Sequence, residues 1–193
     1  MRIAFYGSSL LSSYWNGAAT YYRGLLRDLA GRGYDIVFYE PDAFQRQQHR
    51  DIDPPAWARS IVYPATVEGL RSVLAEARAA EIVVKASGVG VFDDVLLGVF
   101  GEARPGALRI FWDVDAPATL AELGASPDHP LRATLPGLDF VLTYGGGEPV
   151  VSAYQAFGAP DCRPIYNGLD PETHHPAPAE ARFEADLSLL ANR

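Results

Sequence analysis

Residues 2–33, RIAFYGSSLLSSYWNGAATYYRGLLRDLAGRG, combine a continuous apolar run, a glycine-containing loop and a helical pattern. The run from Ile3 to Tyr6 does not alternate with polar residues, which is typical of a strand buried on both faces. Residues 18–30 then repeat apolar side chains at helical spacing, and Gly31 and Gly33 are suitable residues to end that helix. The stretch therefore predicts a strand, a loop and a helix in that order, the repeating unit of an α/β fold.

Similar units follow along the rest of the chain. A second amphipathic pattern covers residues 67–79, and shorter helical patterns cover 93–102, 116–123 and 148–157. Between them lie further apolar runs of strand length, at residues 36–39, 60–63, 82–84, 108–112, 140–142 and 163–166. This alternation predicts a Rossmann-like, doubly wound parallel sheet.

Composition limits the classes of function. With 193 residues and 48% hydrophobic content, the chain can bury a core of ordinary size. Its net charge of −8 argues against a nucleic-acid surface, and the single cysteine, Cys162, rules out an intrachain disulfide or a thiolate metal cluster. There is no signal-type segment and no apolar run of about 20 residues, so we predict a cytoplasmic protein without a membrane span.

The last quarter of the sequence indicates a domain boundary. Asn167-Gly168-Leu169-Asp170-Pro171 follows the last strand-like run, and a proline-spaced stretch comes next, at residues 174–178. We therefore expect residues 1–168 to form one domain and residues 169–193 to be a linker and the first strand, over 185–190, of a missing C-terminal domain. In this interpretation the chain is truncated at the start of a second domain.

Ligands of open α/β sheets bind at the carboxyl ends of the strands, so the residues that follow each strand are candidate site residues. After the first strand, Asn16 and Gly17 precede a helix whose free N–H groups favour an anion. After the fourth come Lys85, Ser87 and Gly88, where the lysine must reach either solvent or a bound anion. An ordinary loop and a solvated lysine are the structural alternatives.

Two further loops complete the candidate set. Asp113 and Asp115 follow the fifth strand and could act as a base, bind sugar hydroxyls or hold a cation, although Asp115 could equally cap the next helix. Tyr144 and the three glycines Gly145, Gly146 and Gly147 follow the sixth strand and expose several backbone donors. We predict no metal site, because the adjacent histidines near the C-terminus diverge in extended structure.

The same loops contain one feature that favours a dinucleotide-binding function and one that argues against it. Glu40 ends the second strand, where a dinucleotide fold places the acid that binds its ribose. The first loop, however, does not have the spacing of the G-x-G-x-x-G fingerprint. The missing glycines argue against a nicotinamide or flavin oxidoreductase, which stays as an alternative.

Five short motifs taken in order resemble the N-terminal half of CgeB-like (spore-maturation) glycosyltransferases, which belong to the GT-B superfamily. They are YGSS with WNG, VKASGVG, WDVDAP, YGGG and YNGLD, at residues 6–9 with 15–17, 84–90, 112–117, 144–147 and 166–170. The resemblance implies an acceptor-side domain of an enzyme that uses a nucleotide-sugar as donor substrate and needs no other cofactor. The acceptor is unidentified, and most donor-binding residues would lie in the missing C-terminal domain.

The resemblance also implies roles for the candidate residues. Gly17, Lys85 and the three glycines would bind phosphate, and Asp113 or Asp115 would accept the proton of the acceptor. The isolated chain would be inactive, because the reacting atoms of such enzymes meet between two domains. A non-catalytic sugar- or partner-binding domain is the main alternative.

Overall fold

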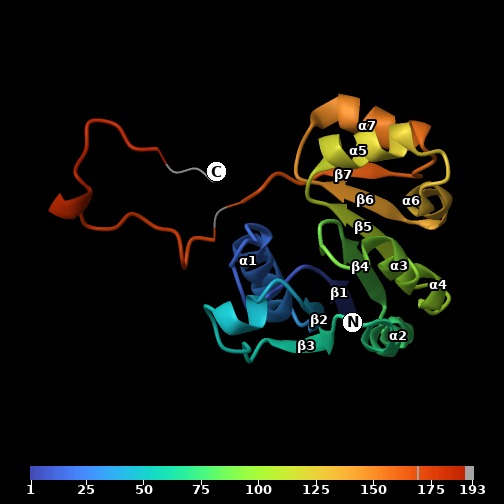
Figure 1. The fold of residues 1–193 in the computed structure, drawn as a ribbon, viewed down its shortest axis with the longest axis horizontal. Coiled ribbons are helices and arrows are strands. Elements are labelled where there is room, and N and C mark those ends of the chain that lie inside the picture. The colour runs from blue at the N-terminus through green and yellow to red at the C-terminus, as the bar shows by residue number, and fades with distance from the viewer. Residues whose placement is uncertain (169, 190–193) are drawn as a thin grey trace.

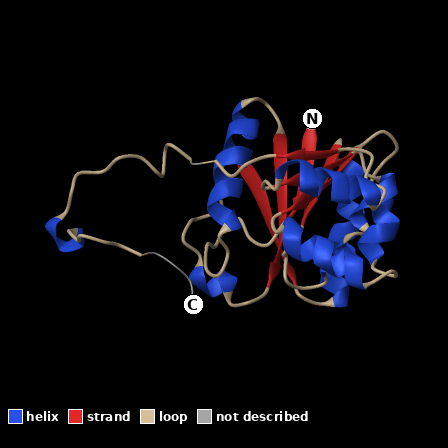
Figure 2. Ribbon diagram, turned by 90° about the horizontal axis from the view of Figure 1, so that it is seen from above, coloured by secondary structure: helices blue, strands red, loops and turns tan. Residues whose placement is uncertain are grey.

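The computed structural model describes residues 1–168 and 170–189, and its first 164 residues contain one parallel sheet with helices on both faces (Figures 1 and 2). The seven strands are β1 Arg2–Tyr6, β2 Asp35–Asp42, β3 Ala58–Pro64, β4 Ile82–Ala86, β5 Leu108–Asp113, β6 Phe140–Thr143 and β7 Cys162–Pro164. Their order in the sheet is β3-β2-β1-β4-β5-β6-β7, and each neighbouring pair is parallel. The predicted Rossmann-like parallel sheet is confirmed.

The helices follow the predicted alternation, with one long helix early in the chain and shorter ones later. They are α1 Ala18–Gly31, α2 Val67–Leu74, α3 Asp93–Leu96, α4 Val99–Glu102, α5 Ala116–Ala125, α6 Pro130–Thr134 and α7 Gly147–Ala156. Single 3-10 turns occur at η1 Arg46–His49, η2 Ala75–Ala79, η3 Leu135–Gly137 and η4 Ala181–Phe183. The helix predicted over 67–79 is therefore divided, because its last turn tightens into η2.

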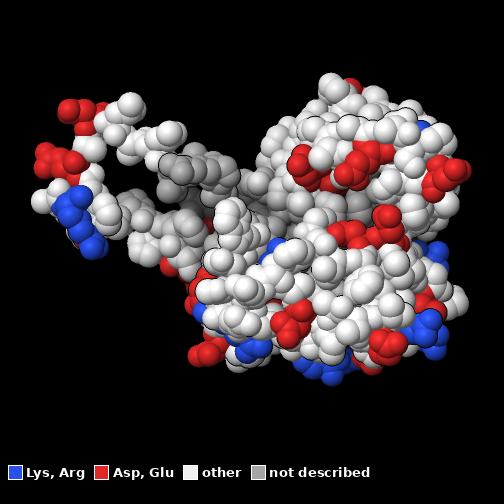
Figure 3. Space-filling model, in the orientation of Figure 1, with Lys and Arg blue, Asp and Glu red and all other residues white. Residues whose placement is uncertain are grey.

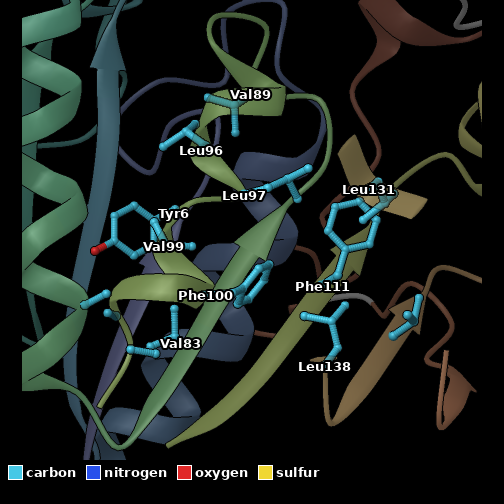
Figure 4. Packing of buried hydrophobic residues seen from close by; sticks show 14 of the residues in the cluster. Tyr6, Val83, Val89, Leu96, Leu97, Val99, Phe100, Phe111, Leu131 and Leu138 are labelled. Carbon is cyan, nitrogen blue, oxygen red and sulfur yellow. The ribbon is translucent and has the colours of Figure 1, made fainter. Parts of the chain in front are cut away.

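Successive residues of each central strand point to opposite faces of the sheet and enter two separate hydrophobic clusters. Tyr6 belongs to the larger cluster, which packs against α2 to α7 and is shown in Figure 4. Phe5 belongs to the smaller one and stacks on Phe38, with ring centroids 5.2 Å apart. Among the described helices, α1 alone contributes to this second cluster, through Tyr22 and Leu26. Both faces of the sheet are thus apolar, as the continuous runs in the sequence predict.

The chain beyond β7 leaves the sheet, first along α1 and then away from it (Figure 1). Asp170 accepts a hydrogen bond from Arg27 of α1 at 2.7 Å, which fixes the start of this segment. Leu187 and Leu189 are almost fully exposed, and residues 184–189 form no strand. The expected strand over 185–190 is therefore not found in its described part, and residue 190 lies outside the described residues. The second domain stays a prediction.

Two absences concern the described residues only. No helix among them is long and apolar enough to span a membrane. No group of three or more potential metal ligands comes together in that part of the chain. The cytoplasmic location stays a prediction.

Cys162 should resist modification in the native protein. The thiol is buried at the start of β7, and desolvation raises its pKa to about 11. Because the thiolate is the reactive form, we expect iodoacetamide at pH 8 to label native Cys162 at least about 100-fold more slowly than the urea-unfolded chain. Mass spectrometry of the two time courses measures this ratio. Equal rates would show that the thiol is accessible.

Candidate ligand-binding cleft

A cleft of about 390 Å³ opens at the carboxyl ends of β4 and β5. Its volume lies within the usual range for small-molecule sites. It is bounded by the loops after these two strands and by α3, α5 and the start of α6. The lining residues are Lys85, Ser87, Gly88, Asp93, Asp94, Leu97, Phe111, Val114, Asp115, Ala118, Thr119, Glu122, His129 and Leu131.

The ammonium of Lys85 is neutralised within the cleft wall. Only 2% of the residue is exposed, and its Nζ lies 2.7 Å from Oδ1 of Asp93 and 5.5 Å from the ring centroid of Phe111. The Asp93 carboxylate also accepts hydrogen bonds from the backbone N–H groups of Val89 and Gly90. A lysine paired in this way contributes little attraction for a phosphate, in contrast to the role that the sequence suggests.

Asp113 lies behind the cleft, fully buried, and its two carboxylate oxygens are occupied by hydrogen bonds. Its Oδ1 accepts from Ser87 Oγ at 2.8 Å, from Thr119 Oγ1 at 2.9 Å and from the backbone N–H of Asp115 at 3.1 Å. Its Oδ2 accepts from the hydroxyl of Tyr154. This geometry describes a residue that joins two loops and α7. The catalytic role predicted for it has no support from the geometry.

Asp115 is exposed on the wall of the same cleft. It occupies the N-cap position of α5, as the capping alternative predicts, yet its side chain makes no capping hydrogen bond. The Asp113 carboxylate binds the local backbone instead, which leaves the Asp115 carboxylate available to a ligand. Of Asp113 and Asp115, it is therefore Asp115 that a ligand can reach.

His129, a residue that belongs to none of the predicted motifs, supplies a nitrogen to the cleft. Its Nδ1 accepts a hydrogen bond from the backbone N–H of Leu131 at 3.2 Å, so in the neutral imidazole the proton resides on Nε2. That Nε2 lies 3.9 Å from Oδ1 of Asp94 and 4.0 Å from Oε2 of Glu122. His129 is therefore a hydrogen-bond donor in a wall otherwise rich in acceptors.

The cleft carries a net negative charge. Four of its lining residues are acidic and one is a lysine already paired with Asp93. Figure 3 shows acidic side chains gathered along a hollow in the region of α3 and α5. Such a wall attracts hydroxyl and amine donors and repels phosphate.

The other predicted residues lie outside this cleft. Gly17 is the N-cap residue of α1, and Tyr144 packs on Tyr21 with ring centroids 5.1 Å apart. Gly145, Gly146 and Gly147 have positive φ angles at the start of α7. Asn16 is buried within its own loop, where it bonds Ser8, Ser9 and Ser12. Of the predicted set, the structure brings together Lys85, Ser87, Gly88 and Asp115.

Glu40 occupies the position expected for a ribose-binding acid, but its carboxylate is buried and bonded to the loop after β1. It accepts from the backbone N–H groups of Leu10 and Leu11, from Ser9 Oγ at 3.0 Å and from Gln47 Nε2 at 2.6 Å. The carboxylate therefore closes the loop that borders the crevice between β1 and β4.

Comparison with known proteins identifies no family. No family model matches the chain, and no curated protein matches it. Among solved structures, BdcA (YjgI) from E. coli is similar over 85% of this chain and 97% of its own, with 12% identity and a TM-score of 0.47. The C-terminal domain of the coenzyme A biosynthesis bifunctional protein CoaBC is similar over 64% of this chain and 69% of its own, with 14% identity and a TM-score of 0.39.

These findings correct the expectation from the short motifs. Neither of these two solved structures is a glycosyltransferase by name, and no family model supports a CgeB-like chain. The assignments to that family and to the GT-B enzyme class are therefore wrong. The nucleotide-sugar and acceptor expected with them stay untested, and they had no basis besides the resemblance. The chain is a protein with a Rossmann-like fold.

Proposed function

We propose that this chain is a binding domain for a small molecule with several hydroxyl groups, which occupies the acidic cleft after β4 and β5. The observation that supports this most directly is the cleft wall, in which Asp94 and Glu122 flank the Nε2 donor of His129 and Asp115 offers a further carboxylate. Neighbouring hydroxyls of a sugar or ribose ring are donors and acceptors at once, so they match a wall of mixed acceptors and one donor. No reaction is assigned to the site.

The charge of the cleft determines which ligands it favours. Lys85 and Asp93 neutralise each other, so a phosphate in the cleft would be repelled by the three remaining carboxylates, those of Asp94, Asp115 and Glu122. We therefore expect a neutral ligand to bind more tightly than its phosphorylated form. This order of affinity is the opposite of that expected for a site built around phosphate.

Calorimetric titration of the whole chain with D-ribose, adenosine and AMP tests the proposal. We expect saturable adenosine binding, weaker ribose binding and AMP binding at least about 5-fold weaker than that of adenosine. Asp115→Asn and His129→Gln should each weaken adenosine binding by about 10-fold, since a hydrogen bond to a charged group contributes roughly 1.5–3 kcal/mol. Glu68→Gln, which removes an exposed carboxylate on α2, is the control and should change nothing. Tighter binding of AMP, or full affinity in both cleft variants, would contradict the proposal.

A nucleotide-cofactor domain is the second candidate, because the strand order around β1 and β4 is the classical order of dinucleotide-binding sheets. A dinucleotide would then lie in the crevice between the loops after β1 and β4. Titration with NAD and FAD distinguishes this candidate: such binding would be insensitive to Asp115→Asn and would depend on the loop at residues 7–17.

A further inference from the structure

Two exposed aromatic side chains, Trp15 and Phe44, have an unfavourable backbone conformation. Trp15 is 72% exposed and has a φ of 48°, and Phe44 is 52% exposed and has a φ of 55°. Positive φ is uncommon for residues other than glycine and a genuine outlier for a bulky side chain. Residues held in this way concentrate at functional sites, where the surrounding structure maintains them.

A buried arginine maintains this arrangement. Arg46 is 6% exposed, and its Nη1 donates to the carbonyl oxygens of Ser8 at 3.2 Å and Val89 at 3.3 Å. Its Nη2 donates to the carbonyl oxygen of Trp15 at 3.5 Å, and its Cζ lies 5.0 Å from the centroid of the Phe44 ring. Burying a guanidinium among carbonyl oxygens costs free energy. Two unfavourable features, the positive φ angles and the buried guanidinium, therefore occur together where both rings are exposed.

One short turn connects these rings to the cleft. Gly88 lines the cleft, and two residues later Gly90 packs under Phe44 so closely that a Cβ at position 90 would lie 2.7 Å from the Phe44 ring. Val89, between them, bonds Arg46 through its carbonyl oxygen. The turn at residues 87–90 thus lines the cleft through Ser87 and Gly88, and it contacts the Phe44 ring and Arg46, which also bonds the backbone of Trp15.

We propose that Trp15 and Phe44 form a stacking surface for a planar nitrogen heterocycle, and that the ligand of the cleft is a nucleoside. The inference rests on the proposed function for the hydroxyl-bearing half of that ligand. An exposed aromatic surface next to a wall of hydrogen-bond acceptors matches the two parts of a nucleoside, a flat π system and a ring with hydroxyls. Aromatic side chains stack on any nucleobase, because every base has a π face.

The fluorescence of Trp15 provides a direct measurement. Of the three tryptophans in the chain, Trp15 has the most solvent-exposed side chain and is the one that a ligand ring can stack on, whereas Trp112 is buried. We expect adenosine and adenine to quench the emission of the whole chain and D-ribose to leave it unchanged. The quenching should disappear in Trp15→Phe, which keeps an aromatic ring and removes the reporter.

Glycine variants separate binding from folding. Trp15→Gly and Phe44→Gly delete one ring each and place at a positive φ the residue that tolerates it best, so neither should lower the melting temperature. Each should weaken adenosine binding by about 10-fold or more. Phe183→Gly, which removes a 70% exposed ring from the segment after β7, is the matched control and should bind adenosine normally.

The outcomes distinguish this inference from the proposed function. If Asp115→Asn weakens adenosine binding while Trp15→Gly and Phe44→Gly bind it normally, the stacking surface is refuted and the cleft stands. If adenine quenches Trp15 and both glycine variants abolish this while Asp115→Asn has no effect on adenosine, stacking stands and the cleft assignment fails. Quenching by ribose as strong as that by adenine would also refute a preference for planar rings.

Discussion

Asp113→Ala is expected to lower the free energy of unfolding by about 4 kcal/mol, the largest loss we expect from one substitution in this chain. The carboxylate is fully buried, and its removal leaves the buried hydroxyl of Tyr154 without its acceptor and takes an acceptor from the half-buried hydroxyls of Ser87 and Thr119. A buried donor that loses its partner costs roughly 1–3 kcal/mol, and several donors lose theirs at once. The expected loss is therefore a multiple of the effect of one hydrogen bond.

Urea unfolding followed by circular dichroism measures this loss. Asp115→Ala is the matched control, two residues away and exposed, and should change stability by no more than about 0.5 kcal/mol. Tyr154→Phe removes one of the hydrogen bonds and should cost about 1 kcal/mol. A change below 1 kcal/mol in Asp113→Ala would show that the network contributes little, and would reopen a role for this carboxylate in ligand binding.

The fold could be predicted because its pattern is local. Continuous apolar runs specify strands covered on both faces, and the helical patterns between them require parallel crossovers. The unequal covering of the two faces could not be predicted in the same way, since each later helix could pack on either side. In the structure α1 alone among the described helices covers the face that contains Phe5 and Phe38.

The candidate site was predicted in part for a similar reason. The ends of neighbouring parallel strands meet at one edge of the sheet, and the candidate residues Lys85, Ser87 and Asp115, from two such ends, line one cleft. Asp113 is buried and Asp115 is exposed because of where β5 ends and α5 begins. The spacing of the two aspartates in the sequence does not specify these positions. His129 enters the cleft from the segment before α6, so only tertiary packing reveals it.

The resemblance to glycosyltransferases failed for a physical reason as well. Its motifs are glycines, serines and aspartates directly after strands, and any Rossmann-like sheet needs such residues there to turn the chain and begin helices. Gly88 and Gly146 have positive φ, and Asp113 binds the backbone N–H of Asp115 at the start of α5. Residues that a fold requires for its turns indicate that fold and not a reaction.

Glu40→Gln is expected to lower the free energy of unfolding by about 3 kcal/mol and to loosen the loop after β1. The carboxylate has no exposed surface and accepts from the backbone N–H groups of Leu10 and Leu11 and from the side chains of Ser9 and Gln47. An amide at this position directs an NH₂ group toward at least one of these donors, which replaces a charge-assisted hydrogen bond by two opposed donors.

Hydrogen exchange and titration together distinguish this structural role from a ligand-binding one. Exchange at the amides of Leu10 and Leu11 should accelerate by about 100-fold, the factor that corresponds to roughly 3 kcal/mol of lost protection if these amides exchange through the weakened state. Asp42→Asn, at the exposed end of the same strand, is the control and should leave both amides unchanged. A ribose-binding acid would behave differently: Glu40→Gln would then abolish NAD binding and leave the stability unchanged. Four donors within the protein already bond this carboxylate, so a ribose could bind Glu40 only by displacing them. We therefore expect the loss of stability.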